Sequence, residues 1–556
     1  MSGSTPQPGS RFSPRLLAGA GLLLVVIVAA IVIAVASSGA SSPKVAVLPQ
    51  TMHRKGPETI FTAGAALKDD PVATLATLEK LGVTRVRLFF TWNELAPAPT
   101  ATRPPAGFDA SNPGAYPAAN WTQYDAVIKA LQAHHIGLDA ILGPPPPRWA
   151  EGKGADKPAK QTWWEPNAHE FQEFAQAVGA RYSGHYTPAG ASKPLPRVAF
   201  WSIWNEPNLG FQLAPQTIDH NTVEESGLLY RRLADAAWNG LRASGHGKDV
   251  TIIGEIGPAG ATFPGAPGKI GAMAPLRFLR ALYCVDANYK TLTGSAATAR
   301  GCPATAAGSA QFASDHPVLF KATAFADHMY SQGLPPNKAT PNEPDYTELA
   351  SVPHLISVLD RLQGVYGSHK RFPVYDTEFG YQTSPPDTQG GTVSPAVAAV
   401  WLNWSEYLHW RTPRIASYDQ YLLHDPVPPP GGGPYTAFAT GLQTYTGQDK
   451  PTLAAFTMPL FLPATKTASG HPLEVWGCVR PETTVARATH RAQFVAIQYR
   501  SGDSGPFKTV DRVQLPKAYC YFDVRTTFPG SGSVRLSWSY PHGPVINSRI
   551  VAVTVG

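Results

Sequence analysis

The strongest single pattern in the sequence is the stretch Val198-Ala199-Phe200-Trp201-Ser202-Ile203-Trp204-Asn205-Glu206-Pro207-Asn208. An apolar, β-branched and aromatic run of this kind is typical of a buried strand, and Pro207 ends it because proline cannot donate to a strand ladder. We therefore expect Asn205 and Glu206 at the carboxyl end of a strand. The tripeptide alone carries little weight, since Asn342-Glu343-Pro344 repeats it with no strand ahead of it.

A second carboxyl stands in a matching context. The β-prone run Phe372-Pro373-Val374-Tyr375-Asp376-Thr377-Glu378-Phe379-Gly380 delivers Glu378 to a strand end, and its glycine permits a tight exit. Two such carboxyls suit glycoside hydrolysis, in which one protonates the leaving oxygen and the other, roughly 5 Å away, attacks the anomeric carbon. Because Glu206 and Glu378 are far apart in the sequence, only the fold could bring them together. The alternative is that each is a surface glutamate beside a strand.

At these residues the sequence resembles the clan A glycoside hydrolases, which are retaining (β/α)8-barrel enzymes. Trp204-Asn205-Glu206-Pro207 resembles the clan's acid/base motif after the fourth strand, and Thr377-Glu378-Phe379-Gly380 resembles its nucleophile motif after the seventh. The likeness spans residues 58 to 456 and is greatest to bacterial cellulase-like sequences of the family 5 and family 39 type. It implies Glu206 as the acid/base and Glu378 as the nucleophile, with no metal and no organic cofactor.

The resemblance also implies residues that surround the two glutamates. Arg87 matches an arginine that hydrogen-bonds near the nucleophile, although a surface cation is the alternative. Tyr330 matches a tyrosine that touches the nucleophile, and His328 matches a histidine that lines the sugar subsite; a structural histidine is the alternative there. Asn205 is expected to hydrogen-bond the sugar 2-hydroxyl.

Three aromatic residues are candidates for stacking on a sugar ring. The clan usually places a tryptophan after the eighth strand, and Tyr421 is expected to substitute for it because this chain has none there. Trp149 and Trp163 lie in a long loop after the third strand, on the side where barrel enzymes bind substrate. Tryptophan can stack on the C–H face of a sugar, or it can simply anchor the loop.

Two further acids end predicted strands. Alternation places Asp376 on the same side as Glu378, so we expect Arg85 or Arg87 to neutralise it or its pKa to rise. Glu255 could accept a hydrogen bond from a sugar hydroxyl, but we interpret it as an ordinary polar strand end.

The fold class that these patterns predict is α/β, a (β/α)8 TIM barrel with a C-terminal β-sandwich domain and an N-terminal transmembrane helix. Residues 58–458 alternate between strand and helix patterns. The predicted strands cover residues 59–62, 84–92, 135–143, 198–204, 250–255, 322–330, 372–378 and 415–421. From residue 460 to 556 the pattern changes to short alternating strands without helical periodicity, which predicts the β-sandwich accessory domain.

The amino terminus carries a candidate membrane anchor. Residues 16–36 are uncharged and mostly apolar, a length that spans a bilayer, although a signal peptide cleaved after Ala36 is the alternative. Residues 1–15 would then form a cytoplasmic tail, and residues 37–57 a tether. Charges flank the span on both sides, so the positive-inside rule does not orient it.

Cysteine usage indicates an oxidising compartment. The four cysteines fit two local disulfides, Cys284 with Cys302 and Cys478 with Cys520, and the alternative is four buried thiols. Disulfides would place the catalytic domain outside the cytoplasm, attached to the cell membrane by a single span. The net charge of +7 could suggest nucleic acid, but lysine and arginine are scattered and no nucleic-acid-binding motif is present.

The sequence therefore predicts a retaining O-glycosidase that acts by double displacement on an extracellular or envelope polysaccharide or oligosaccharide, with internal cleavage favoured. The alternatives are a catalytically silent glycan-binding barrel and an exo-glycosidase or transglycosylase on the same fold. The sugar, the linkage and the oligomeric state are not predicted.

Overall fold

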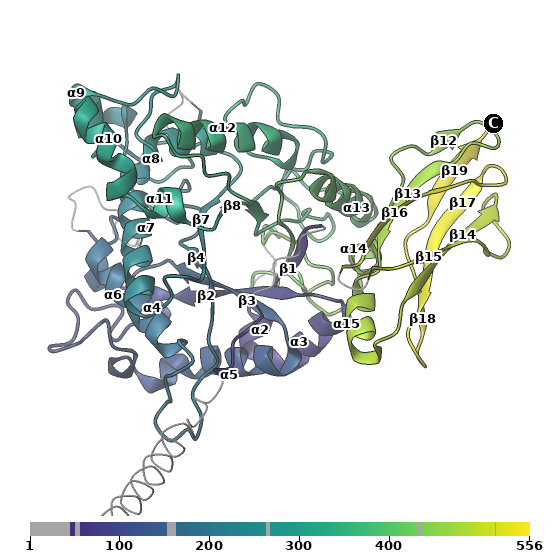
Figure 1. Cartoon of the computed structure of the whole chain (residues 1–556), viewed down its shortest axis with the longest axis horizontal. Helices are drawn as coiled ribbons and strands as arrows, with labels where there is room; N and C mark the ends of the chain where they lie inside the picture. The colour runs from purple at the N-terminus through teal and green to yellow at the C-terminus, as the bar shows by residue number, and fades with distance from the viewer. Residues whose placement is uncertain (1–44, 50–55, 153–162, 263–266, 431–434, 517–518) are drawn as a thin grey trace, which may run out of the picture. The chain divides into compact units, whose positions relative to one another are not determined.

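Eight parallel strands form a barrel at the centre of the molecule (Figure 1). The computed structural model describes residues 45–49, 56–152, 163–262, 267–430, 435–516 and 519–556. The strands are hydrogen-bonded in the order β10-β1-β2-β3-β4-β7-β8-β9. Their bounds are β1 Glu58–Thr62, β2 Arg85–Thr91, β3 Gly137–Gly143, β4 Phe200–Ile203, β7 Val250–Ile256, β8 Ala324–Asp327, β9 Val374–Asp376 and β10 Ser417–Tyr421.

The sheet closes between its two outer strands. Val374 of β9 donates to the Arg414 carbonyl at 2.8 Å and accepts from the Ala416 amide at 2.7 Å, just before β10 begins. A parallel bridge joins Val374 to Ile415. Each strand is predicted within the correct region of the sequence, but most are shorter than predicted, and β4, β8 and β9 are shortened most. The chain leaves the ladder early at these three strands and presents its next residues at the barrel mouth.

Helices cover the outer face of the barrel. The local sequence determines where several of these helices begin. Pro71 is the first residue of α3, which the Asp70 carboxylate caps, and the side chain of Asn167 caps α6. The long helices are α3 Pro71–Lys80, α5 Ala118–His134, α6 Ala168–Arg181, α7 Ser226–Ala243, α8 Pro275–Leu282, α10 Ala306–Asp315, α12 Val352–Val365 and α13 Pro395–Arg411. Shorter ones are α2 Ala66–Asp69, α4 Trp92–Leu95, α9 Gly294–Ala299, α11 Val318–Lys321 and α14 Pro451–Thr457, and a small hairpin joins β5 Thr217–Ile218 to β6 Val223–Glu224.

Strand alternation separates two buried layers. In β2, the outward residues Val86, Leu88 and Phe90 belong to the large apolar core between strands and helices. A small apolar cluster fills the barrel interior and contains Ile60, Phe200, Ile252, Ala324, Ala326 and Tyr375. The inward arginines of β2 are also buried. Arg85 lies 3.1 Å from the carboxylate of Glu58, and Arg87 belongs to the site described below.

The C-terminal residues form a second domain made of two β-sheets over a shared apolar core. One sheet has the order β11-β13-β16, and the other has β12-β19-β17-β14-β15, with β18 paired to β17. The bounds are β11 Leu460–Phe461, β12 Lys466–Thr467, β13 Leu473–Cys478, β14 Phe494–Ser501, β15 Lys508–Gln514, β16 Tyr521–Thr526, β17 Gly532–Ser539, β18 Val545–Asn547 and β19 Val551–Val555. The expectation that helical structure ends at residue 460 is wrong, because α15 covers Arg480–Thr489. Only Ala486 and the first three residues of this helix are buried, so its apolar signal is weak.

Packing on the barrel explains why α15 forms where it does. Arg480 Nη2 lies 2.5 Å from Glu406 Oε1 of α13, and the Tyr521 hydroxyl donates to the same oxygen at 2.9 Å. Gly82, which precedes β2, has no room for a side chain, since an added Cβ would lie 2.1 Å from the Arg480 carbonyl oxygen. The second domain is therefore seated closely against the barrel.

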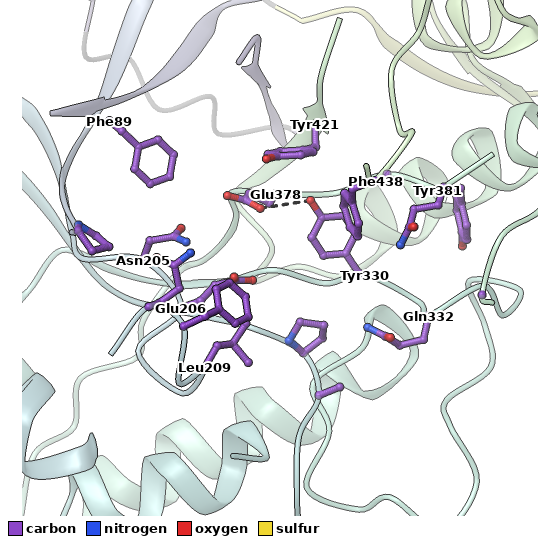
Figure 2. A pocket seen from close by; sticks show the side chains of 18 of the residues that line it. Phe89, Asn205, Glu206, Leu209, Tyr330, Gln332, Glu378, Tyr381, Tyr421 and Phe438 are labelled. Carbon is purple, nitrogen blue, oxygen red and sulfur yellow. Dashed lines mark hydrogen bonds between the residues drawn. The ribbon is translucent and has the colours of Figure 1, made fainter. Parts of the chain in front are cut away.

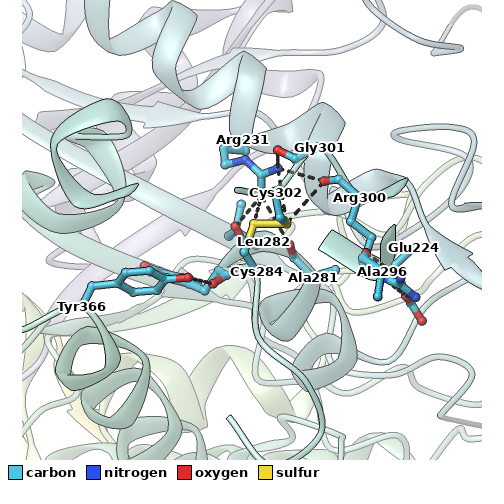
Figure 3. Close-up of a disulfide and its surroundings, with 11 residues drawn as sticks. Glu224, Arg231, Ala281, Leu282, Cys284, Ala296, Arg300, Gly301, Cys302 and Tyr366 are labelled. Carbon is cyan, nitrogen blue, oxygen red and sulfur yellow. Dashed lines mark hydrogen bonds and ion pairs between the residues drawn. A yellow bond between two sulfur atoms is a disulfide. The ribbon is translucent and has the colours of Figure 1, made fainter. Parts of the chain in front are cut away.

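Both predicted disulfides are present. Cys284 is bonded to Cys302 and Cys478 to Cys520. Figure 3 shows that the guanidinium of Arg231 reaches the first disulfide, with 3.1 Å between Nη1 and Cys284 Sγ. The same guanidinium donates to the carbonyl oxygens of Leu282, Arg300 and Gly301, so it joins the two chain segments that the disulfide links.

Within the part of the chain that the structure describes, no helix is long and apolar enough to cross a membrane. The predicted span of residues 16–36 and the predicted tail of residues 1–15 lie outside the described residues, as does most of the predicted tether. The membrane anchor stays a prediction.

Candidate active site

A cavity of about 660 Å³ opens where the carboxyl ends of the barrel strands meet (Figure 2). Parallel barrels place their active sites at this end, because the loops that follow the strands converge there. The residues that line the cavity are Phe89, Pro144, Pro145, Trp163, Asn205, Glu206, Leu209, Phe211, Gln212, Pro258, Ala259, Tyr330, Gln332, Gly333, Glu378, Gly380, Tyr381, Gln382, Gly391, Tyr421 and Phe438.

The two candidate catalytic carboxyls face each other across this cavity. Glu206 follows β4, Glu378 follows β9, and one oxygen of each lies within 4.8 Å of the other. The side chain of Glu378 is 10% exposed and that of Glu206 is 14% exposed, so both are sheltered yet reach the cavity. The fold therefore brings together the two residues that the sequence singled out.

Arg87 lies beneath the carboxyls and connects them to the barrel interior. Its Nη1 donates to Glu378 Oε1, and its Nη2 donates to Asn205 Oδ1 at 3.0 Å and to Glu255 Oε2 at 2.6 Å. Burial alone would lower the pKa of Arg87, but the charges of Glu255 and Glu378 raise it. Arg87 is fully buried and does not line the cavity, so it holds the carboxylate and the amide from beneath.

His328 bridges the two catalytic candidates from behind. Its Nδ1 lies 3.0 Å from Glu206 Oε1 and 3.7 Å from Glu378 Oε2, and its Nε2 lies 3.2 Å from Glu255 Oε2. Burial would lower the pKa of His328, but the negative charge of Glu378 and the hydrogen bonds to Glu206 and Glu255 raise it well above the usual value. The expectation that His328 lines the sugar subsite is wrong, because its side chain is fully buried under the carboxyls.

Glu255, which the sequence interpretation took for an ordinary polar strand end, belongs to the centre of the site. It is fully buried, and it accepts from Thr377 Oγ1 at 2.9 Å in addition to its contacts with Arg87 and His328. Burial would raise the pKa of Glu255, but Arg87 and His328 lower it to about 2. Its position at a strand end was the one available signal, and the same signal had selected Glu206.

A break in the strand turns Glu255 inward. The pairing of β7 with β8 shifts register between Ile253 and Ile256, and the intervening Gly254 has φ +103°. Only glycine fits there, because an added Cβ would lie 2.6 Å from the Ala326 carbonyl oxygen. The site thus depends on a local irregularity that strand alternation cannot predict.

The backbone at the site is strained. Trp204 (φ +66°), Glu206 (φ +41°) and Glu255 (φ +49°) occupy the left-handed region that residues with side chains rarely adopt. The Glu206 amide donates to the Glu255 carbonyl at 2.8 Å, which links two of these positions directly. Such strain persists only where the surroundings impose it, and it concentrates at functional sites.

Two more acids lie inside the barrel near Arg87. Asp139 lies 3.8 Å from Arg87 Nε and accepts from Ser202 Oγ at 2.8 Å. Burial and the charge of Glu255 raise the pKa of Asp139 to about 7, against the opposing effect of Arg87. Burial raises the pKa of Asp419 well above its usual value. The interior therefore favours a protonated form of these acids while Glu255 stays ionised.

The expectation that Asp376 faces the same side as Glu378 is wrong, whereas of the two alternatives for its charge, the raised pKa is confirmed. Alternation holds only as far as Asp376, where β9 ends, so this side chain faces the helices while Glu378 faces the cavity. Its partner is His409 of α13, at 2.7 Å, and neither Arg85 nor Arg87 pairs with it. Burial raises the pKa of Asp376, and the hydrogen bond from His409 opposes that shift.

Aromatic residues wall the Glu378 side of the cavity. The Tyr330 hydroxyl donates to Glu378 Oε2 at 3.3 Å, as drawn in Figure 2, and burial raises the pKa of that tyrosine well above its usual value. Tyr421 lines the cavity where the clan's tryptophan was expected. Its ring packs edge-on against Phe438, 5.8 Å away, a residue the sequence interpretation did not select because it lies in a loop without a motif.

The two candidate tryptophans have different positions. Trp163 lines the cavity, whereas Trp149 does not. Trp149 donates from Nε1 to the Pro97 carbonyl at 3.1 Å and packs edge-on against Trp92 and Phe108. Trp149 therefore anchors the loop, and Trp163 remains the candidate for stacking.

The site also contains a set of atoms that could hold a metal ion. One ligand atom each from Glu206, His328 and Glu378 lies within 4.8 Å of the others. However, Arg87 donates to Glu378, and His328 carries a raised pKa, so a cation there would have to displace existing positive charge. The donor set fits paired carboxylates with buried counter-charges better than a metal centre.

Comparison with known proteins finds solved structures at low similarity. No family model and no curated protein matches the sequence. Among solved structures, a family 39 glycoside hydrolase from Bacteroides cellulosilyticus WH2 aligns with 13% identity over 86% of this chain and 81% of that chain, with a TM-score of 0.42. An endo-β-1,4-mannanase from Thermotoga petrophila aligns with 12% identity over 92% of this chain and 99% of the mannanase chain, with a TM-score of 0.39. A family 1 β-glucosidase from Thermotoga maritima aligns with 15% identity over 70% of this chain and 85% of the glucosidase chain, with a TM-score of 0.43. At these identities and TM-scores, the similarities give no information about the activity or substrate of this chain.

Proposed function

We propose that the protein is a retaining glycoside hydrolase in which Glu378 is the nucleophile and Glu206 is the acid/base. The observation that supports this most is the approach of the two carboxyls, with one oxygen of each within 4.8 Å. Retaining glycosidases hold their carboxyl groups about 5–5.5 Å apart, whereas inverting enzymes need roughly 6.5–9.5 Å to admit a water molecule. The spacing therefore favours double displacement.

The first step forms a bond between Glu378 and the anomeric carbon. Glu378 Oε1 is engaged by Arg87 and Oε2 by the Tyr330 hydroxyl, and these contacts fix the direction of the carboxylate. Glu206 donates its proton to the departing oxygen as the glycosidic bond breaks.

The second step releases the sugar. Glu206, now ionised, takes a proton from water, and the water oxygen attacks the anomeric carbon and displaces Glu378. Asn205 accepts from Arg87 through Oδ1, which leaves its amide nitrogen to donate to the sugar 2-hydroxyl. The configuration at the anomeric carbon is retained after two inversions.

The same arrangement argues against a silent glycan-binding barrel. Glu255, Arg87 and His328 are fully buried ionisable groups, and burying charge is costly unless the groups are paired. A binding site for neutral sugars has no need of this buried network behind two carboxyls. We retain the transglycosylase as an outcome of the test below, since the geometry of the first step is common to both.

We also propose that the enzyme acts outside the cytoplasm. The two disulfides support export, because such bonds persist in oxidising compartments. The membrane anchor predicted for residues 16–36 would hold the barrel near its own membrane.

Substitution of the two glutamates tests the assignment. Glu378→Ala should abolish turnover, and added azide should restore it with a glycosyl azide of inverted configuration. Glu206→Ala should keep activity on aryl glycosides whose good leaving groups need little protonation. Glu343→Ala is the matched control, since Glu343 belongs to the second Asn-Glu-Pro and should be dispensable.

Products analysed with and without a sugar acceptor distinguish hydrolysis from transglycosylation. Wild-type activity in both Glu206→Ala and Glu378→Ala would contradict the assignment.

A further inference from the structure

The two sides of the cavity differ in chemistry. On the Glu378 side, the lining includes the polar side chains of Tyr330, Gln332, Tyr381, Gln382 and Tyr421. The lining residues that follow β4, the strand of Glu206, and its neighbours β3 and β7 make up the Glu206 side: Pro144, Pro145, Trp163, Asn205, Leu209, Phe211, Gln212, Pro258 and Ala259, of which Asn205 and Gln212 carry amide side chains. Figure 2 shows Leu209 beside Glu206, away from Tyr381 and Tyr421.

The apolar side lies against the acid/base. The Leu209 amide donates to the Glu206 carbonyl at 2.8 Å, closing a turn that brings this side chain back to the carboxyl. A Cβ placed on Gly257 would lie 3.1 Å from Leu209 Cδ1 and 3.2 Å from Glu206 Oε1, so the two side chains share one small space. Because Glu206 must reach the departing oxygen, these apolar residues surround the leaving group.

Buried hydrogen bonds hold the backbone that carries the apolar residues of the Glu206 side, which we call the wall, so its position does not depend on a ligand. Asn208 is fully buried; its Nδ2 donates to the Gly257 carbonyl at 3.0 Å, and its Oδ1 accepts from the Gly257 amide at 2.8 Å. The Gly210 amide donates to the Gly271 carbonyl at 2.9 Å. Phe211, on this supported turn, is nevertheless 54% exposed. A rigid backbone that exposes a phenylalanine into a cavity has the form of a preformed apolar subsite.

The charge of the cavity restricts the sugar itself. None of its described lining residues is lysine, arginine or histidine, and Glu206 and Glu378 are the carboxylates among them. The nearby cations, Arg87 and His328, are fully buried and already engaged by carboxylates. A uronic acid, sulfate or phosphate group would meet negative charge with no accessible counter-ion among the described lining residues, which is unfavourable at short range.

We infer that the cavity takes an uncharged glycoside whose leaving group is apolar, an alkyl, acyl-chain or aryl aglycone, in place of the sugar polymer predicted from the sequence. The inference rests on the proposed function, because it assigns the leaving group to the Glu206 side. A second sugar in that position would need several hydrogen-bond partners; with Asn205 held by Arg87 and assigned to the 2-hydroxyl, the described wall offers one further amide side chain, Gln212. An apolar chain would instead bury surface against Leu209, Phe211 and Pro258.

Alkyl glycosides of one neutral sugar test this without changing leaving-group acidity. The sugar is first chosen as the best substrate among neutral aryl glycosides. Ethyl to octyl glycosides of that sugar are then compared below their critical micelle concentrations. We expect kcat/KM to rise by about two- to fourfold per methylene over the first several carbons, since each buried CH₂ contributes about 0.8 kcal/mol at most.

Two matched variants locate the effect. Phe211→Ala should lower the ratio of kcat/KM for the octyl glycoside to that for the ethyl glycoside by at least about fivefold, as expected for losing most of one aromatic contact. Phe494→Ala removes a similarly exposed phenylalanine (51%, against 54% for Phe211) from the second domain and should keep the wild-type ratio.

The outcomes separate the inference from the proposed function. The inference would be overturned if kcat/KM did not rise from the ethyl to the octyl glycoside, or if an oligosaccharide or uronide were cleaved faster than the octyl glycoside. Either result would leave the glycosidase assignment intact. An enzyme that cleaves no aryl glycoside, alkyl glycoside, oligosaccharide or polysaccharide would overturn both.

Discussion

Asp376 Oδ2 lies 2.7 Å from His409 Nε2, and both side chains are fully buried between the barrel and α13. His409 Nδ1 lies 2.8 Å from the Ser405 carbonyl oxygen, which can only accept, so Nδ1 carries a hydrogen. One shared proton therefore joins Nε2 to the carboxyl. The other carboxyl oxygen accepts from the Met329 amide at 3.4 Å. Met329 stands between His328 and Tyr330, which contact Glu206 and Glu378.

We expect Asp376 to act as a positioning residue. Asp376→Ala should lower the free energy of unfolding by about 1–3 kcal/mol, because it leaves a buried histidine without its partner. It should also lower kcat more than it raises KM, since Met329 would no longer fix its neighbours. Asp376→Asn can still donate to Nε2 and should restore most of both losses. Urea denaturation and steady-state kinetics measure these effects.

Asp360 provides the control for that comparison. Its ion pair with Arg414 is one-third exposed on the Asp360 side, so Asp360→Ala should cost at most about 1 kcal/mol and leave kcat unchanged. Equal effects of Asp360→Ala and Asp376→Ala on kcat would contradict the positioning role.

The two loop tryptophans should respond in opposite ways. Trp163→Ala should raise KM by about tenfold with little loss of stability, because it removes apolar contact with substrate in the cavity. Trp149→Ala should lower the free energy of unfolding by about 2–3 kcal/mol, because this ring packs against Trp92 and Phe108. Thermal unfolding measures the stability of the two variants, and steady-state kinetics on one substrate measures their KM. The assignment fails if Trp149→Ala raises KM and Trp163→Ala does not.

Glu482 should make stability depend on pH. Its side chain is 1% exposed, and neither carboxyl oxygen has a hydrogen-bond partner in the described structure. Burial raises the pKa of Glu482 from 4.5 to about 7. A carboxyl whose pKa is raised in the folded state favours folding while it is protonated, and this advantage is lost as the pH rises from 4.5 through 7.

We therefore expect Glu482→Gln to stabilise the protein more at pH 8 than at pH 5, as measured by urea denaturation midpoints. Asp503→Asn, an exposed change in the same domain, should have the same effect at both values of pH. A pH-independent effect of Glu482→Gln would show that this carboxyl is not kept neutral by the fold.

Strand-end patterns in the sequence were sufficient to find the two glutamates. An apolar run that stops at Asn-Glu-Pro and a β-prone run that stops at Glu-Phe-Gly both deliver a carboxyl to the barrel mouth, and no long-range information is needed to see this. The resemblance to clan A pointed to Arg87, and alternation in β2 agrees with its inward direction.

The remaining parts of the site depend on contacts that sequence spacing does not encode. Glu255 faces inward because of a register shift at Gly254, and its importance comes from meeting Arg87 and His328. Asp376 and Glu378 face different ways because alternation ends with β9. Phe211 lies on a turn whose position depends on hydrogen bonds between Asn208 and Gly257, two residues that are far from each other in the sequence.

Covalent trapping on Glu378 tests the central claim most directly. A 2-deoxy-2-fluoro glycoside with an activated leaving group slows both steps but allows the glycosyl-enzyme to accumulate when that group departs easily. With the sugar that the enzyme accepts, intact-protein mass spectrometry should show addition of one fluoroglycosyl unit. Peptide mapping should place that unit on Glu378, and Glu378→Gln should remain unlabelled. Labelling of another residue, or inverted product from an active enzyme that is never labelled, would contradict the account.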